Sequence, residues 1–404
     1  MAEIKKALTK EHGFPKNYSD EFLILDKGEG VYVFDVAGKR YLDFGSGIAV
    51  NALGYGNKEI AAIASAQMEK LVHVSNLFTT EPALKFASKL VDGKRFSAVH
   101  FGNSGSEANE AAIKYAKLWS IRTKGPECYK ILSFSGAFHG RTMGALASTY
   151  NNKYKEPFGP MIPGAEIIEY NNVEKLKESL NESFAAVIVE VVQGEGGLRS
   201  LSKEFVSALN DICRKHKVLI IADEVQTGMG RTGDLFACDG VGLDADIITL
   251  SKPLAGGLPL SATLIPDYVN EKVKVGEHGT TFGGGPVTTA VASYVWDMIT
   301  GEGFLEGVKE KSAFLTGKLE DLKNKYSFIK EIRGKGLLLG LEIDENDRVD
   351  VLKIMGEARD KGLLLLKTGV NVLRLAPPLV ISQDEIEEGI AILDSVLKEL
   401  KQKL

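Results

Sequence analysis

Short apolar runs alternate with amphipathic segments of helix length from residue 98 to about residue 250. The runs lack the polar alternation of a strand with one face in water, so each is predicted to be a strand buried on both faces. Buried strands separated by helices indicate a parallel or mostly parallel sheet covered by helices. The predicted strands lie at 98–101, 131–134, 185–190, 218–223 and 246–250.

The two ends of the chain follow a different pattern. Residues 30–43 predict two short strands around a turn at Ala37-Gly38, the glycine-punctuated residues 44–57 are expected to be irregular, and a helix is expected at 58–72. After about residue 290, charged amphipathic segments flank short apolar pieces, which predicts a smaller α+β unit. We therefore expect an α/β fold in three parts. These are an N-terminal segment that joins the small domain, a large domain, and the C-terminal small domain, at residues 1–50, 51–290 and 291–404.

Composition is that of an ordinary soluble globular protein, with 44% apolar and 25% charged residues. The net charge of −5 comes from interspersed acids and bases, so neither a nucleic-acid nor an anionic-membrane partner is expected. No stretch approaches about 18 consecutive apolar residues, and the first ten residues lack the apolar run of a secretory signal. The three cysteines show no disulfide or metal-ligand spacing. These features predict a cytoplasmic protein without a bound metal.

In such sheets ligands bind at the carboxyl ends of the strands, so the polar residues that follow the apolar runs are the candidates. Lys252 follows the run at 246–250, and Asp223 ends the run at 218–223. A desolvated lysine loses its proton more readily and can attack a carbonyl. An unpaired carboxylate at the end of an apolar strand is costly, so Asp223 should face a cationic group. Taken singly, a solvated lysine and a helix-capping acid are the simpler interpretations.

Further strand ends carry groups that suit an anionic, aromatic ligand. Gly105 and Ser106 open a helix whose free N–H groups and positive dipole end favour a phosphate, although Ser106 could simply cap the helix. Phe138 and Arg141 could stack on a flat ring and bind a carboxylate, or they could belong to an ordinary loop, with His139 packing or orienting a neighbour. Glu195, in a glycine-rich loop, is either exposed or neutralises an arginine across a cleft.

Together these groups match the requirements of pyridoxal phosphate, whose aldehyde bonds to a lysine and whose ring nitrogen needs an acid. The order of the motifs is more specific than any one of them, and it resembles that of the subgroup III pyridoxal-phosphate aminotransferases, a fold-type I family. The resemblance spans about residues 18–380. It rests on GSEANEAAIKYA, FHGRT, QGEGG, IADEVQTGMGRTG, SKPLAGGLP, HGTTFGG and LRLAPPL, in that order.

The resemblance implies a role for each matching residue. Lys252 would be the Schiff-base lysine and Asp223 the partner of the pyridine nitrogen. Thr281 would reach the phosphate from a second subunit, which implies an obligate homodimer with active sites at the interface. The rest of the cofactor shell would consist of Gln226 at the ring hydroxyl, Phe138 and Val225 on the two ring faces, and Gly105 and Ser106 at the phosphate.

The resemblance also implies a substrate site. Arg141 would bind the carboxylate remote from the reacting amine, and Arg374 would bind the α-carboxylate of glutamate or 2-oxoglutarate. Glu195 would pair with Arg374 while the amine donor is bound. Ile48 stands where the ornithine group tends to carry a tyrosine, and Tyr18 stands where that group keeps one near the substrate carboxylate. The acetylornithine group is the most similar, with the ornithine and 4-aminobutyrate groups nearby.

The expected reaction is therefore transfer of the terminal amine of N-acetylornithine to 2-oxoglutarate, a step of arginine biosynthesis. Val191, Gly285 and the turn at Tyr55 depart from the family pattern at the pocket rim or the dimer contacts. Ornithine, 4-aminobutyrate, succinylornithine or another acylated diamine remain alternative donors, as does aminomutase chemistry. A nucleotide-dependent α/β oxidoreductase is a rival from another class, although the G-x-G-x-x-G fingerprint is missing. A non-catalytic binding protein of this fold is a further alternative.

Overall fold

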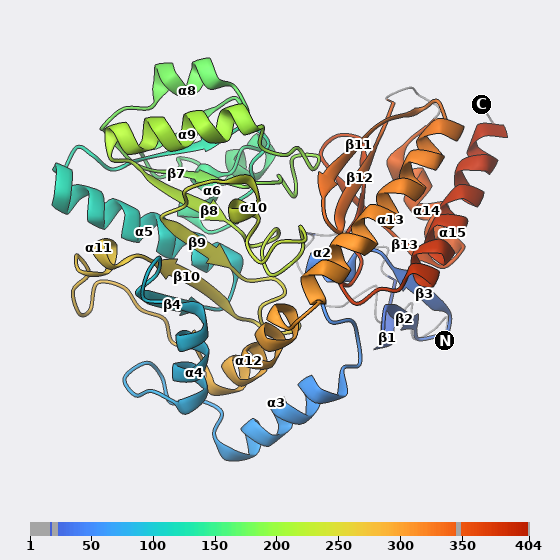
Figure 1. Ribbon diagram of the computed structural model, residues 1–404, viewed down its shortest axis with the longest axis horizontal. Helices are drawn as coiled ribbons and strands as arrows, with labels where there is room; N and C mark the ends of the chain where they lie inside the picture. The colour runs from blue at the N-terminus through green and yellow to red at the C-terminus, as the bar shows by residue number, and fades with distance from the viewer. Residues whose placement is uncertain (1–16, 18–22, 345–348, 403–404) are drawn as a thin grey trace.

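The computed structural model describes residues 17, 23–344 and 349–402, and shows a large unit beside a smaller one (Figure 1). The large unit is built on a seven-stranded sheet with the strand order β4-β10-β9-β8-β7-β5-β6. Its strands are β4 (Ala98–Gly102), β5 (Lys130–Phe134), β6 (Ala165–Ile168), β7 (Phe184–Val189), β8 (Leu219–Asp223), β9 (Ile247–Leu250) and β10 (Ser261–Ile265).

This sheet confirms the mostly parallel arrangement expected from the apolar runs. The strands from β9 to β6 are parallel, whereas β10 runs antiparallel to both β4 and β9. All five predicted strands are present, and β6 and β10 were not predicted. The residues of β10 are all buried, but two of them are Ser261 and Thr263, so its sequence lacks a continuous apolar run. The hydroxyl of Thr263 donates to the backbone of Ala108 at 2.9 Å, which makes its burial tolerable.

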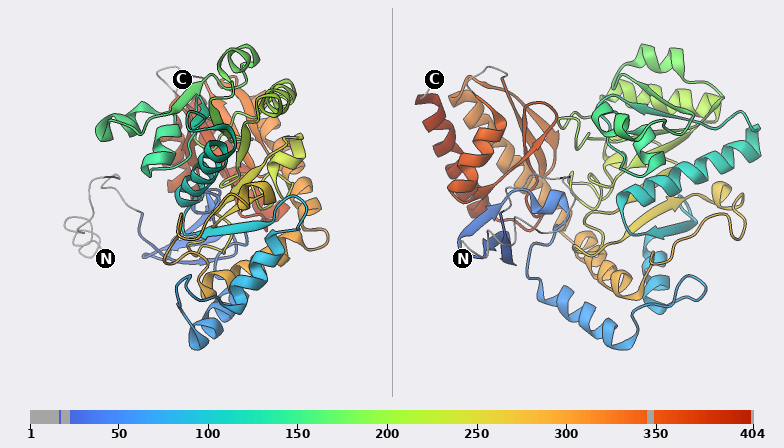
Figure 2. Two further views of the ribbon diagram at one scale, coloured as in Figure 1. Left: turned by 90° about the vertical axis from the view of Figure 1, so that its left-hand side faces the viewer. Right: turned by 180° about the vertical axis from the view of Figure 1, so that it is seen from behind.

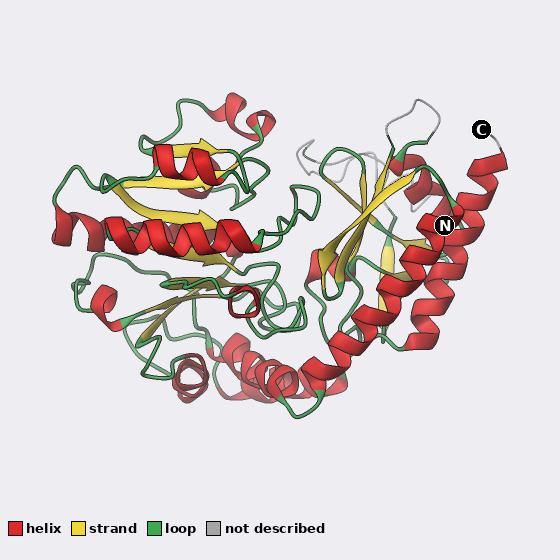
Figure 3. Ribbon diagram, turned by 45° about the horizontal axis from the view of Figure 1, so that its top comes forward, coloured by secondary structure: helices red, strands yellow, loops and turns green. Residues whose placement is uncertain are grey.

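Helices cover both faces of the large sheet (Figure 3). One face is covered by α5 (Gly105–Lys124), which packs on β7, β9 and β10. The other carries α9 (Lys203–His216) over β8, while α12 (Pro286–Thr300) packs against α3 (Lys58–Lys70) and α4 (Glu81–Leu90). No helix in the described part of the chain is long and apolar enough to cross a membrane. The shorter helices are α6 (Met143–Ser148), α7 (Asn152–Lys155), η1 (Glu156–Phe158), α8 (Val173–Ser179), α10 (Ala237–Val241) and α11 (Asp267–Asn270).

The smaller unit combines the N-terminal strands with the C-terminal part of the chain, and in the right-hand view of Figure 2 the blue strands lie beside the orange and red elements. Its two four-stranded sheets have the orders β1-β2-β3-β13 and β11-β12-β15-β14. Parallel pairing of β3 with β13 joins the N-terminal strands to the C-terminal part of the chain. The domain boundaries after residues 50 and 290 stay predictions. The elements are β1 (Leu25–Glu29), β2 (Tyr32–Asp35), β3 (Arg40–Asp43), β11 (Ile329–Lys335), β12 (Leu338–Ile343), β13 (Leu363–Leu364), β14 (Leu366–Thr368), β15 (Val372–Leu375), α13 (Phe304–Lys325), α14 (Val351–Asp360) and α15 (Gln383–Gln402).

The glycine-rich segment after β3 contains a short turn, α2 (Ser46–Ala49), rather than a regular helix. Gly47 and Ile48 both have a φ of 64°, in the left-handed region. A β-branched residue is rarely found there, so Ile48 is held in a strained conformation by its surroundings. The side chain of Ile48 is exposed. The segment therefore presents Ile48 on a surface, where it does not pack into the core of its own chain.

Candidate active site

A cavity of about 190 Å³ opens at the carboxyl ends of the strands in the large sheet. Its wall comes from the loops that follow β4, β5, β7, β8 and β9, which is the edge where the sequence predicts a ligand. Most of the residues singled out from the sequence line this one cavity. They are Gly105, Ser106, Phe138, Glu195, Asp223, Val225, Gln226 and Lys252.

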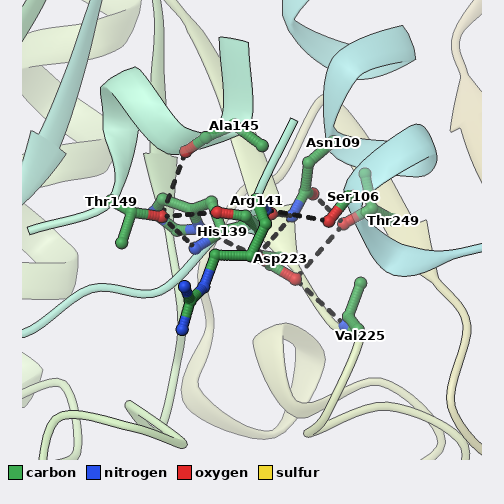
Figure 4. Close-up of polar contacts among 10 residues, drawn as sticks. Ser106, Asn109, His139, Arg141, Ala145, Thr149, Asp223, Val225 and Thr249 are labelled. Carbon is green, nitrogen blue, oxygen red and sulfur yellow. Dashed lines mark hydrogen bonds and ion pairs between the residues drawn. The ribbon is translucent and has the colours of Figure 1, made fainter. Parts of the chain in front are cut away.

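Asp223 is the centre of a buried hydrogen-bond network at the end of β8 (Figure 4). Its Oδ2 atom lies 2.7 Å from Nδ1 of His139 and 2.8 Å from Nδ2 of Asn109. The backbone N–H of Val225 donates to Oδ1 at 3.1 Å. The sequence predicts a cationic group opposite this carboxylate, but the structure surrounds it with hydrogen-bond donors and a histidine. These partners offset the cost of burying the carboxylate.

Sequence reasoning missed Asn109 as a functional residue. This asparagine lies on the buried, alanine-rich face of α5, and only 1% of its surface is exposed. Its amide is oriented by Thr249, whose hydroxyl donates to the amide oxygen at 2.8 Å. A lone polar residue on an apolar helix face requires a hydrogen-bond partner. This pattern in the sequence could have identified Asn109. For His139, the structure favours the orienting interpretation, because its ring nitrogen contacts Asp223.

Lys252 lies two residues beyond β9 and lines the same cavity. Burial lowers the pKa of its ammonium to about 8, and the nearby guanidinium of Arg374 contributes to that shift. Glu195, Asp223 and Glu190 oppose it. A lysine with a pKa near neutrality is partly in its neutral form, which is the form that attacks a carbonyl.

Glu190 is a second buried carboxyl group in the cavity wall. Burial, and then the negative charge of Asp223, raises its pKa well above the usual range of a glutamate. Its Oε2 atom has no hydrogen-bond partner in the described part of the chain, and the same holds for Oε1 of Gln226 and Nε2 of His139. Buried polar atoms are normally paired, so three unpaired atoms in one cavity wall indicate that a polar ligand belongs there.

The loop after β4 forms the start of α5 and one wall of the cavity. Ser104 is the N-cap, because its side chain accepts a hydrogen bond from the backbone N–H of Glu107 at 3.3 Å. The alternative in which Ser106 caps the helix is therefore wrong. Instead, the hydroxyl of Ser106 accepts from the backbone N–H of Arg141 at 3.2 Å. The first N–H groups of a helix have no partner within the helix, so Gly105 and Ser106 present donors for an anion.

Glu195 and Arg374 form an ion pair across the two units. Nη1 of Arg374, on β15, donates to Oε1 of Glu195 at 2.6 Å and to the carbonyl oxygen of Gly194 at 2.9 Å. Arg374 is only 3% exposed, and its Nε atom has no partner within the described residues. A buried arginine of this kind is costly without a carboxylate, so Glu195 or a substrate carboxylate must stay close to it.

Four described residues of the predicted site do not line the cavity, namely Arg141, Ile48, Thr281 and Arg374. Arg141 lies on the aromatic ring of Tyr154, with its guanidinium carbon 3.5 Å from the ring centroid. Ile48 and Thr281 are exposed on the single chain. Tyr18 lies outside the described residues.

A second, larger cleft of about 910 Å³ between the two units shares Phe138 and Glu195 with the cavity, and Tyr154 also lines it.

His139, Glu190 and Asp223 also offer ligand atoms within 4.8 Å of one another, which is close enough for a metal ion. Nδ1 of His139 and Oδ2 of Asp223 are already engaged with each other at 2.7 Å. The expectation of a site without metal stays a prediction.

Comparison with known proteins places this geometry in a family. The Aminotransferase class-III family matches residues 14–397. The mitochondrial acetylornithine aminotransferase of Eremothecium gossypii is 44% identical over 397 residues, which cover 95% of this chain and 93% of the relative. The acetylornithine aminotransferase of Vibrio cholerae is 42% identical over 383 residues, with 95% of each chain covered.

Solved structures agree with the sequence comparison. The ornithine aminotransferase of Toxoplasma gondii superimposes with a TM-score of 0.94 at 30% identity, covering 100% of this chain and 96% of that one. The acetylornithine aminotransferase of Elizabethkingia anophelis gives 0.85 at 34% identity, covering 98% and 99%. The fold class and the family expected from the motifs are confirmed. The chain belongs to the class-III aminotransferases, and it is a pyridoxal-phosphate-dependent transaminase.

Proposed function

We propose that this transaminase transfers the terminal amino group of N-acetylornithine to 2-oxoglutarate, giving N-acetylglutamate semialdehyde and glutamate. The ion pair between Glu195 and Arg374, close to Lys252, carries the proposal. The same pocket must first bind a terminal amine without a neighbouring carboxylate and then an α-amino acid. A glutamate that covers the arginine for one substrate and uncovers it for the other meets both requirements without leaving a buried charge unpaired. The names of the relatives from E. gossypii and V. cholerae support this choice of donor.

The cavity fits pyridoxal phosphate, because its wall offers unpaired polar atoms beside a lysine of lowered pKa. We assign Asp223 to the ring nitrogen and Gln226 to the ring hydroxyl. When bound, the cofactor supplies an electron-withdrawing ring that stabilises the charge left as a substrate carbon loses its proton. The remaining contacts are the two ring faces, to Phe138 and Val225, and the phosphate, to the N–H groups of Gly105 and Ser106.

Lys252 acts through its Nζ atom. At rest this amine holds the cofactor, and its lowered pKa keeps a share of the unbound lysine neutral and able to bond. Once it is free, Nζ would accept the proton that the substrate carbon loses and pass it on as the acid–base group of the 1,3-transfer. Asp223 stabilises a positive charge on the ring nitrogen, while His139 and Asn109 fix the carboxylate in place.

Two arginines divide the recognition of carboxylates. Arg141 binds the carboxylate remote from the reacting amine of N-acetylornithine. Arg374 binds the α-carboxylate of glutamate or 2-oxoglutarate after Glu195 has moved aside. Planar guanidinium groups suit this task, because they bind carboxylates with two parallel hydrogen bonds.

We further propose that the protein is a homodimer. Leu77, Phe78 and Phe282 are 88%, 73% and 67% exposed, which is unusual for large apolar side chains that lie close together. Phe78 and Phe282 line a surface pocket together with Thr281, and the loop that carries Thr281 is held by hydrogen bonds from Asn76 to its backbone at 3.0 and 3.2 Å. A second subunit that covers this patch would bring Thr281 to its phosphate.

A cytoplasmic location is part of the same proposal, because the three cysteines are all free thiols, as expected in a reducing compartment. Biosynthesis of arginine is the metabolic role that fits the proposed donor and product. Of the alternatives, unacylated ornithine is the one favoured by a specific likeness, since the T. gondii structure is an ornithine aminotransferase.

Kinetics with a panel of amine donors tests the proposed function. N-acetylornithine, ornithine, 4-aminobutyrate and N-succinylornithine are each supplied with 2-oxoglutarate, and kcat/KM is compared. We expect N-acetylornithine to give the highest value. A clear preference for unacylated ornithine would replace the proposed donor.

A further inference from the structure

Tyr154 lies against the arginine to which the substrate carboxylate is assigned, although no motif of the sequence analysis includes it. The guanidinium carbon of Arg141 is 3.5 Å from the centroid of the Tyr154 ring and 5.7 Å from that of Phe138. The two rings meet edge to face, with centroids 6.2 Å apart and planes at 87°. Arg141 thus lies beside two aromatic side chains that come from different segments of the chain.

The backbone holds both partners of this contact in place. Tyr154 lies on α7, whose first turn is capped by Asn151, and the cap accepts a hydrogen bond from the backbone N–H of Lys153 at 3.1 Å. The backbone N–H of Arg141 donates to the hydroxyl of Ser106, at the start of α5. Both residues are therefore tied to short, well-defined turns, and the stacking is set by the fold.

Stacking on a ring leaves the hydrogen-bonding edge of a guanidinium free. The five N–H donors of an arginine lie in its plane, whereas the ring contacts its face. Among the described residues, no carboxylate lies within ion-pair distance of Arg141. Its charge is therefore available to an anionic ligand, and its plane is already fixed. An arginine fixed in this way loses less conformational freedom when it binds a carboxylate.

We propose that Tyr154 is a positioning residue that presents Arg141 to the α-carboxylate of the amine donor. It selects donors that carry this carboxylate over amines that lack it. The proposal rests on the proposed function, and it adds a specificity determinant that lies outside the cavity around Lys252. Tyr154 also contacts Phe138, which we assign to one face of the cofactor ring. Because Tyr154 contacts both residues, it fixes the position of Arg141 relative to that ring.

Two variants separate the aromatic face from the hydroxyl group. Tyr154→Leu removes the ring under Arg141, whereas Tyr154→Phe retains it. A matched control is Tyr129→Leu, because Tyr129 also lies under a cation, Lys117 at 5.9 Å, but does not line the cavity or the larger cleft. Each protein is assayed with N-acetylornithine and with N-acetylputrescine, which keeps the amine and the acyl group but lacks the carboxylate.

We expect Tyr154→Leu to raise KM for N-acetylornithine about three- to tenfold, with kcat changed less than about twofold, consistent with the loss of a cation–π contact and of a fixed orientation. The value of kcat/KM for N-acetylputrescine should stay within about twofold. Tyr154→Phe and Tyr129→Leu should match the wild type with both donors. Calorimetric binding of N-acetylnorvaline, which has the carboxylate but no terminal amine, should weaken by the same factor in Tyr154→Leu without any turnover.

An equal loss with both donors in Tyr154→Leu would show a merely structural role and overturn the proposal, as would no loss with either. A loss in Tyr154→Phe equal to that in Tyr154→Leu would assign the effect to the hydroxyl group and would also overturn it. If the wild type rejects N-acetylornithine in favour of ornithine, the proposed function fails by itself. The comparison of ornithine with putrescine then decides the role of Tyr154.

Discussion

Nδ1 of His139 lies 2.7 Å from Oδ2 of Asp223, and both side chains are buried at the end of a central strand. Because Asn109 donates to the same oxygen at 2.8 Å, Oδ2 is occupied by partners from two other elements. Among the described residues, Oδ1 keeps only the longer contacts to Val225 at 3.1 Å and Thr249 at 3.5 Å. We infer that Oδ1 is the atom left to a protonated ring nitrogen.

Replacing this carboxylate tests the assignment of Asp223 to the ring nitrogen. Asp223→Asn keeps the shape of the side chain but removes the negative charge that we assign to a protonated ring nitrogen. We expect kcat to fall about a hundredfold or more, in the range found when a single electrostatic contact to a reacting group is lost. Asp239→Asn, which alters an exposed carboxylate paired with Arg95, is the control and should keep wild-type rates in the same steady-state assay. Unchanged turnover in Asp223→Asn would remove Asp223 from the mechanism.

The tendency of ligands to bind at the carboxyl ends of strands is enough to place Lys252, Asp223 and the start of α5 at one edge of the sheet. This tendency does not predict which residues from distant parts of the chain contact them. Asn109 meets Asp223 because a helix crosses the sheet, and Tyr154 meets Arg141 because a short turn folds back over it. Neither contact leaves a periodic signal in the sequence. The buried strand β10 was missed for a related reason, since its hydroxyl-bearing residues interrupt the apolar run.

The lowered pKa of Lys252 predicts how capture of the cofactor depends on pH. A lysine with its ordinary pKa of 10.5 is almost fully protonated at pH 8, whereas a pKa of about 8 makes half of it neutral there. The rate at which cofactor-free protein takes up pyridoxal phosphate should therefore rise with pH and level off above about pH 8. Stopped-flow absorbance from pH 6 to 10 measures this rate.

Two variants test what sets the midpoint of this pH dependence, the pH at which the uptake rate reaches half of its maximum. Arg374 lowers the pKa of Lys252 and Glu195 raises it. Arg374→Gln should therefore move the midpoint to higher pH, and Glu195→Gln should move it to lower pH. A rate that continues to climb beyond pH 9 in the wild type would mean that Lys252 keeps an ordinary pKa.

The pairing of Glu195 with Arg374 predicts a change in substrate preference. Glu195→Gln weakens the cover over Arg374, so the site should favour a substrate with an α-carboxylate. We expect the half-reaction with N-acetylornithine to lose about tenfold in kcat/KM while the half-reaction with glutamate is retained, as expected when a charged partner of a buried arginine is lost. Separate single-turnover measurements of the two half-reactions give the ratio. An equal decrease in both would contradict the alternating role of Glu195.

The assignment of Thr281 to the other subunit can be tested with hybrid dimers. Thr281→Glu places a negative charge near the cofactor phosphate, and Lys252→Ala removes the reactive amine, so each variant alone should be inactive. Co-expression of the two gives hybrids in which one site carries both defects and the other carries neither. We expect such hybrids, purified with two different tags, to recover up to about half of the wild-type activity. If Thr281 served its own chain, both sites would be damaged and the hybrid would stay inactive.

The covalent attachment of the cofactor is the most direct test of the central claim, that Lys252 is the amine at the reacting centre. Purified protein is loaded with pyridoxal phosphate, reduced with borohydride and digested, and the modified peptide is identified by mass spectrometry. We predict a single label per chain, on Lys252, and loss of both the label and the transaminase activity in Lys252→Ala. A label on a different lysine, or full activity in Lys252→Ala, would contradict that assignment.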